Sequence, residues 1–127
     1  MTSQIDDPVS IPLTPDEREL LTRGLSEWGG PAHCTDELAI AMGFASVKDL
    51  FSQADRLLDA LKKQVPLSSS DWARTLVATE IAFASNVFGS GLDWATTTGL
   101  SDEKTVRLLR QLQGKIGAVL ARSSRGP

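Results

Sequence analysis

The most apolar stretch of the chain, TLVATEIAFASNVFGSG (residues 75–91), is apolar on nearly every side when it is drawn as a helix. A helix that crosses a membrane needs about 20 consecutive apolar residues, whereas this stretch is shorter and contains the ionisable Glu80. We therefore expect it to form the most buried helix of a soluble fold, with the other helices packed around it.

Glu80 is the buried polar residue that this arrangement predicts. A carboxylate inside an apolar helix must be paired, hydrogen-bonded or protonated. We expect its partner to be an Arg of a neighbouring helix or the hydroxyl of Thr79 or Ser85. A structural role is favoured over a catalytic one, because no second carboxylate lies at helical spacing from Glu80.

Residues that start and end helices divide the rest of the chain into further helices. Thr14 predicts a cap, and the Pro15-Asp16-Glu17 that follows places a proline and two acids at the start of a helix over roughly 15–28. Similar signals predict the other helix boundaries, which we place at Gly29-Gly30-Pro31, Thr35, Gly43, Ser46, Pro66, Ser69 or Ser70, Gly89-Ser90-Gly91, Thr98 and Ser101.

This pattern predicts an all-α fold class with about six helices. Each half reads long helix, glycine-rich break, short helix and long helix, and the PLT at 12–14 recurs as PLS at 66–68. We infer two pseudo-repeated tri-helical units, 12–64 and 66–122, that share one core in a single domain. Common helix punctuation would give the same likeness without a duplication. We expect a flexible arm at 1–11 and a flexible tail at 123–127.

Charge is distributed unevenly along the chain. The formal net charge is -3, but residues 1–100 carry 7 basic and 14 acidic groups, and residues 101–127 carry 6 basic and 2 acidic groups. We therefore expect a positive surface only near the C-terminal end. Cys34 is the single cysteine, which excludes an intrachain disulfide, and the first residues do not resemble a signal peptide. The sequence predicts a cytoplasmic protein.

Residues 92–113 have the rhythm of two helices joined by a tight turn. The pattern consists of apolar residues, one small residue and a turn glycine, at Leu92, Ala95, Gly99, Leu100, Val106 and Leu109. On these residues the segment resembles helix-turn-helix (tri-helical) domains. The resemblance implies that the last helix, 101–122, reads DNA with its outward side chains, which are Lys104, Arg107, Gln111 and Lys115. The alternative is a helical hairpin with a solvated charged face.

Two further groups of residues are candidate sites. Trp28, Trp72 and Trp94 lie at helix ends, where they either anchor a binding partner or close a small core with the indole N–H bonded inside. His33 and Cys34 are adjacent in a loop, and no other His or Cys is present to complete a zinc shell. We expect no metal and no cofactor.

The function that this sequence favours is that of a small, acidic, non-catalytic helical interaction protein. It would bind a protein partner, as an immunity protein, an antitoxin or an adaptor does, or it would form a homodimer. The acidic first hundred residues would suit a basic partner surface. The alternative is a helix-turn-helix regulator that binds DNA through the last helix. We expect neither an enzyme nor a membrane protein.

Overall fold

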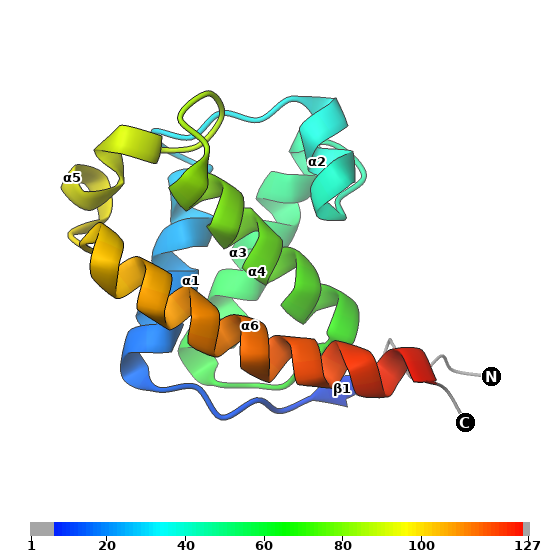
Figure 1. Ribbon diagram of the computed structural model, residues 1–127. Coiled ribbons are helices and arrows are strands. Elements are labelled where there is room, and N and C mark those ends of the chain that lie inside the picture. Colours follow the sequence, from blue (N-terminus) through cyan, green and yellow to red (C-terminus); the bar gives the residue numbers. More distant parts are fainter. Residues whose placement is uncertain (1–6, 126–127) are drawn as a thin grey trace.

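The computed structural model describes residues 7–125, and side chains as far as residue 122 (Figure 1). Within this range the chain forms six α-helices, which are α1 (Pro15–Glu27), α2 (Asp36–Met42), α3 (Val47–Lys63), α4 (Ser69–Ala84), α5 (Trp94–Thr98) and α6 (Asp102–Arg125). A 3-10 turn, η1 (Gly91–Asp93), precedes α5, and the strands β1 (Pro8–Val9) and β2 (Leu67–Ser68) pair antiparallel. The helices pack against one another, which confirms the predicted all-α class. Among the described residues, no helix has the length and apolar character that crossing a membrane requires.

The helices begin and end where local chemistry satisfies their free backbone groups. The predicted caps Thr14, Thr35 and Ser101 are confirmed, since each side-chain oxygen accepts a backbone N–H of the first helical turn. The cap of α4 is Ser68, so the expected cap at Ser69 or Ser70 is wrong by one or two residues. Short α2 and α5 end at glycines in the left-handed region, with φ of 105° at Gly43 and 77° at Gly99.

Helix α4 lies in the middle of the fold, as its apolar sequence predicts. It packs against both α1 and α6, and α6 crosses in front of it in Figure 1. The approach of α1 is very close, because a Cβ added to Gly24 would lie only 2.5 Å from Oγ1 of Thr79. The backbones of α1 and α4 therefore meet at a point where one of the two residues has no side chain.

Helix α6 covers the core with one face, on which Leu109, Leu112 and Ile116 are buried. Val106, which belongs to the helix-turn-helix pattern, is 46% exposed, whereas Thr105 is buried. The hydroxyl of Thr105 accepts a hydrogen bond from the indole of Trp94 at 2.9 Å. A polar residue can lie inside the core when its hydrogen-bonding group has a partner there, and the Trp94 indole is that partner for Thr105.

The two chain ends differ from the flexible segments that the sequence suggested. Pro8 pairs with Ser68 and Val9 with Leu67, so this part of the predicted arm is an ordered strand. At the other end α6 continues to Arg125, so the backbone of residues 123–125, part of the predicted tail, is helical. Residues 1–6 and 126–127 lie outside the described residues. The long–short–long order occurs in both halves, and the internal duplication remains a prediction.

A buried ion pair joins α6 to the start of α1. The Glu17 side chain is 1% exposed, and its Oε1 accepts hydrogen bonds from the Lys115 ammonium at 2.6 Å and from the Thr14 backbone at 2.8 Å. The same ammonium donates to the Pro12 carbonyl at 2.8 Å. Burial acts to raise the pKa of Glu17, but the bonds from Lys115 and Thr14 outweigh it and leave this pKa below its ordinary value.

We expect Lys115→Met to lower the free energy of unfolding by about 2–3 kcal/mol near neutral pH, because a buried carboxylate loses its cation. Since the pKa of Glu17 is lowered by folding, the pair stabilises the fold above the unfolded-state pKa of about 4.3 and loses this effect as the pH falls through the folded-state pKa. Urea unfolding at several pH values should therefore show the difference shrinking towards acid.

The matched control is Lys104→Met on the same helix. Its ammonium lies 3.6 Å from Asp16, and both side chains are substantially exposed, at 38% and 55%. The expected loss is therefore no more than about 0.5 kcal/mol. Equal losses for the two variants would show that the buried Lys115–Glu17 pair stabilises the fold no more than the exposed Lys104–Asp16 pair does.

Three glycines, one in α1 and two in α6, lead to a second prediction about the free energy of unfolding. A Cβ at Gly114 or Gly117, both within α6, would meet nothing within 4 Å, so an alanine at each position should raise the free energy of unfolding by about 0.5–1 kcal/mol. Gly24→Ala should instead lower it by about 1–3 kcal/mol, because the new methyl group collides with Thr79. Thermal or urea unfolding measures all three, and stabilisation by Gly24→Ala would contradict the close α1–α4 approach.

Candidate functional site

The structure places all three tryptophans in the core, with exposed fractions of 2% for Trp28, 3% for Trp72 and 0% for Trp94. Their indole N–H groups donate to the Ala78 carbonyl at 3.1 Å, the Val9 carbonyl at 2.9 Å and the Thr105 hydroxyl. These buried rings agree with the alternative that the tryptophans close the core, and a role for them in partner binding stays a prediction. Burial of a large ring becomes favourable once its polar N–H is satisfied inside.

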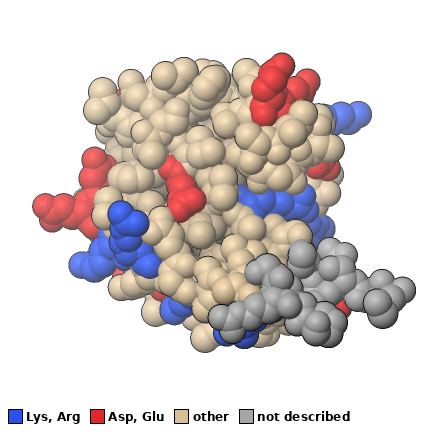
Figure 2. All heavy atoms as spheres, turned by 45° about the vertical axis from the view of Figure 1, so that its right-hand side comes forward, with Lys and Arg blue, Asp and Glu red and all other residues tan. Residues whose placement is uncertain are grey.

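The residues proposed to read DNA are divided between internal contacts and solvent. Lys104 reaches Asp16, and Lys115 binds Glu17 and the Pro12 carbonyl, so both contact the first helix or the segment before it. Arg107 and Gln111 are exposed. On the side that Figure 2 shows, basic groups form separate patches with uncharged or acidic surface between them.

Two residues that carry the helix-turn-helix resemblance do not make the contacts it implies. Ala95 was expected where one helix crosses another closely, and Val106 was expected against the core, but both are exposed. Gly99 does adopt the left-handed turn, with φ of 77°.

Glu80 lies half-buried, and it is less enclosed than the sequence suggested. Its Oε2 accepts a hydrogen bond from the side-chain amide of Gln113 in α6, at 2.6 Å. The partner is therefore neither an Arg nor one of the two hydroxyls that we expected. The Thr79 hydroxyl donates to the Thr75 carbonyl, and the Ser85 hydroxyl accepts the backbone N–H of Phe88. Glu80 is thus a structural hydrogen-bonding residue between α4 and α6.

His33 and Cys34 do not form a site together. His33 is exposed and its ring lies edge-on to Phe88, with 6.5 Å between the ring centres. Cys34 is half-buried, and burial together with the nearby Asp36 raises the pKa of its thiol. Within the described part of the chain, no group of three or more His, Cys, Asp or Glu residues could hold a metal ion.

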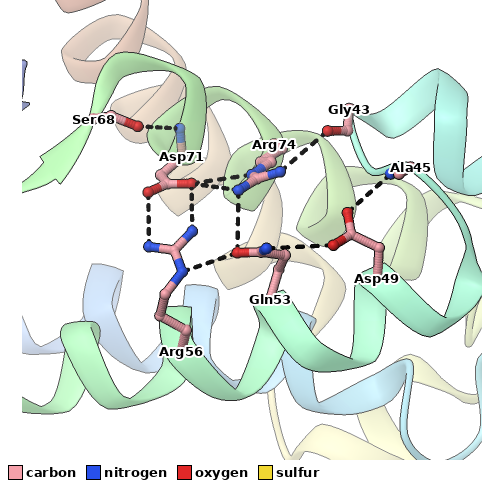
Figure 3. Close-up of polar contacts among 8 residues, drawn as sticks. All are labelled: Gly43, Ala45, Asp49, Gln53, Arg56, Ser68, Asp71 and Arg74. Carbon is pink, nitrogen blue, oxygen red and sulfur yellow. Dashed lines mark hydrogen bonds and ion pairs between the residues drawn. The ribbon is translucent and has the colours of Figure 1, made fainter. Parts of the chain in front are cut away.

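A polar cluster between α3 and α4 was not predicted from the sequence (Figure 3). The Asp71 carboxylate accepts two bonds from the Arg56 guanidinium, at 2.8 and 2.9 Å, and two from Arg74, at 2.7 and 3.1 Å. The Asp71 side chain is only 10% exposed. Burial acts to raise the pKa of Asp71, but the hydrogen bonds from the two arginines outweigh it and hold this pKa below its ordinary value.

The same cluster fixes the turn between α2 and α3. Arg74 donates to the Gly43 carbonyl at 3.2 Å and stacks over the ring of Phe44, with its guanidinium carbon 4.9 Å from the ring centre. The Gln53 side chain accepts from both arginines and donates to Asp49. Figure 3 shows these bonds as one connected network that holds one flank of α3 against α4.

The opposite flank of α3 borders a groove. At about 100° per residue, Gln53 and Arg56 lie on one side of the buried stripe of α3, and Phe51 and Leu58 lie on the other. Between this second flank and α1 are two adjoining hollows of about 730 and 420 Å³, which share Ser26 and Leu58. We call them the α1–α3 groove, which is lined by Pro15, Arg18, Glu19, Thr22, Arg23, Leu25, Ser26, Trp28, Gly29, Phe51, Ala54, Asp55, Leu58, Asp59 and Lys62.

The α1–α3 groove is apolar at one end and charged at the other. Phe51 is 46% exposed, and Leu58 is half-buried against the core. At the other end the walls carry exposed pairs, Glu19 with Arg23 at 4.0 Å and Asp59 with a lysine just outside the groove, Lys63, at 3.0 Å. An apolar floor with charged walls suits an amphipathic segment, whose two faces differ in the same way.

No family model, curated protein or solved structure matches this chain. The helix-turn-helix resemblance of residues 92–113 therefore remains a prediction.

The sequence did contain a signal for the groove. The apolar stripe of α3 is broad and includes Leu57, Leu58 and Phe51. Leu57 is buried in the core, and the part of the stripe that stays exposed, at Phe51, forms the apolar end of the groove.

We expect Asp71→Asn to lower the free energy of unfolding by about 2–4 kcal/mol, because it leaves two guanidinium groups without their carboxylate. Asp59→Asn is the matched control, since it breaks an exposed pair within one helix and should cost about 0.5 kcal/mol or less. Urea unfolding near neutral pH compares them. A loss for Asp71→Asn as small as that of the control would contradict the proposed role of the cluster in holding α3.

Proposed function

We propose that this protein is a non-catalytic helical interaction module that binds a protein partner through the α1–α3 groove. The single observation that carries the proposal is an apolar floor left open to solvent, with Phe51 46% exposed beside half-buried Leu58. A partner would lay the apolar face of an amphipathic helix along α1 and α3. Isolated exposed apolar residues are common, but here exposed Phe51 and half-buried Leu58 border the same hollow between helices.

The charges favour a partner with a basic surface. Residues 1–100 carry 7 basic and 14 acidic groups, so this part of the molecule would attract positive charge over long range. Such attraction raises the association rate more than the lifetime of a complex, and salt weakens it. An immunity protein, an antitoxin or an adaptor would use the groove in this manner. Binding of a second copy is the other form of the same proposal.

The alternative is a helix-turn-helix regulator that binds DNA through α6. It retains Arg107 and Gln111 as exposed candidates, while Lys104 and Lys115 would have to leave their contacts with α1 or the segment before it. Exposed Asp102 at the start of α6 would also meet the phosphates. We therefore prefer the groove as the binding surface.

Site-specific photo-crosslinking tests the groove. A benzoylphenylalanine at position 51 should give a crosslinked product of discrete mass in the native host cell, whereas the same group at position 106 should not. Phe51 and Val106 are matched controls, since both are exposed to the same extent, 46%. Leu58→Asp, checked for folding by circular dichroism, should abolish the product, because a charge on the groove floor opposes apolar contact.

The mass of the crosslinked product distinguishes self-association from binding of a different protein. Twice the chain mass indicates self-association, and any other discrete mass indicates a different protein. Equal products at positions 51 and 106, or none at 51, would contradict the groove proposal. Retardation of duplex DNA that Arg107→Ala abolishes and low salt strengthens would support the alternative.

A further inference from the structure

A separate hollow of about 400 Å³ lies between the segment before α1 and the end of α3. Its lining includes Ile11, Leu13, Leu61 and Trp72, together with the polar side chains of Arg18 and Gln64. Small-molecule sites typically have volumes of about 300–1,000 Å³, apolar walls and a few polar groups that point inward. Only Arg18 is shared with the α1–α3 groove, at the junction between the two.

Arg18 of α1 differs from the arginines of α3 and α4 in its bonding partners. Arg56 and Arg74 bind Asp71, whereas among the described residues no carboxylate pairs with Arg18. Its side chain makes one long hydrogen bond, from Nη2 to the Leu13 carbonyl at 3.5 Å. A guanidinium has five N–H donors, so Arg18 keeps most of its capacity for a ligand in the hollow.

Gln64, which lines the hollow together with Arg18 and Ser10, has an unusual backbone conformation. Gln64 ends α3 with φ of 58°, in the left-handed region that favours glycine, and it is the one non-glycine residue with positive φ in the described chain. Its side-chain amide has no hydrogen-bond partner among the described residues. Gln64 thus places an unbonded side-chain amide at the hollow, although glycine would adopt this backbone conformation with less strain.

We propose that this hollow binds a small organic acid. The carboxylate would accept paired hydrogen bonds from Arg18, since a guanidinium and a carboxylate match in geometry and charge. The hydrocarbon part would pack on half-buried Ile11 and Leu13 and on Val65, which is 45% exposed. Trp72 and Leu61, which are each 3% exposed, also line the hollow. No Asp or Glu lines the hollow to repel such a ligand. The proposal does not depend on what the α1–α3 groove binds.

Titration with hexanoate, followed by NMR of the indole N–H groups, tests this site. The Trp72 signal should move and saturate with a Kd on the order of 1 mM, as expected for a ligand of this size. The signals of Trp28 and Trp94 should stay in place, because neither residue lines this hollow. Hexanamide, which has nearly the same shape without the charge, should bind at least about tenfold more weakly.

Arg18→Met removes the guanidinium and keeps most of the apolar stem, and it should weaken hexanoate binding about tenfold or more. Arg23→Met is the control on the same helix, since Arg23 borders the groove but not this hollow. The proposal would be overturned by the absence of a saturable Trp72 shift, by equal binding of hexanamide, or by unchanged binding in Arg18→Met. The hexanamide comparison uses the unaltered chain, so it remains decisive even if Arg18→Met fails to fold.

Discussion

The contact between α1 and α4 is the constraint on which the rest of the structure depends. Gly24 lets the two backbones approach until Thr79 fills the space of a side chain, and Trp28 at the C-terminal end of α1 donates a hydrogen bond to the Ala78 carbonyl of α4. With one side of α4 covered by α1, the remaining apolar surface of α4 becomes available to α6, which buries Leu112 and Ile116 in the same core. The hydrophobic term is non-directional, so the glycine decides which helix lies closest.

Charged contacts then fix the outer elements at defined angles. Lys115 joins α6 to buried Glu17 and to the Pro12 carbonyl in the segment before α1, and Asp71 holds α3 through Arg56. Because Asp71 binds only one flank of α3, the other flank stays open and borders α1 across the groove. The open surface that we propose for partner binding is therefore a consequence of how α3 is held.

Both proposed sites lie along α1 and meet at Arg18. The groove offers an extended apolar floor for a helix, and the smaller hollow offers an unpaired guanidinium beside Trp72. A ligand in the hollow would engage the side chain that also forms the end wall of the groove. The two sites differ in what they recognise, since one depends on shape and apolar area and the other on charge.

The sequence by itself determined the number and order of the helices, because caps such as Thr14 and Thr35 and glycines such as Gly43 act within a few residues of their own position. It also marked α4 as central. Only the tertiary structure decided which polar side chains are enclosed. Glu17 and Asp71 are buried because cations from other helices reach them, and local patterns contain no record of such distant partners. The tertiary structure likewise decided that Thr105 is buried and bonded to Trp94, whereas Val106 is exposed.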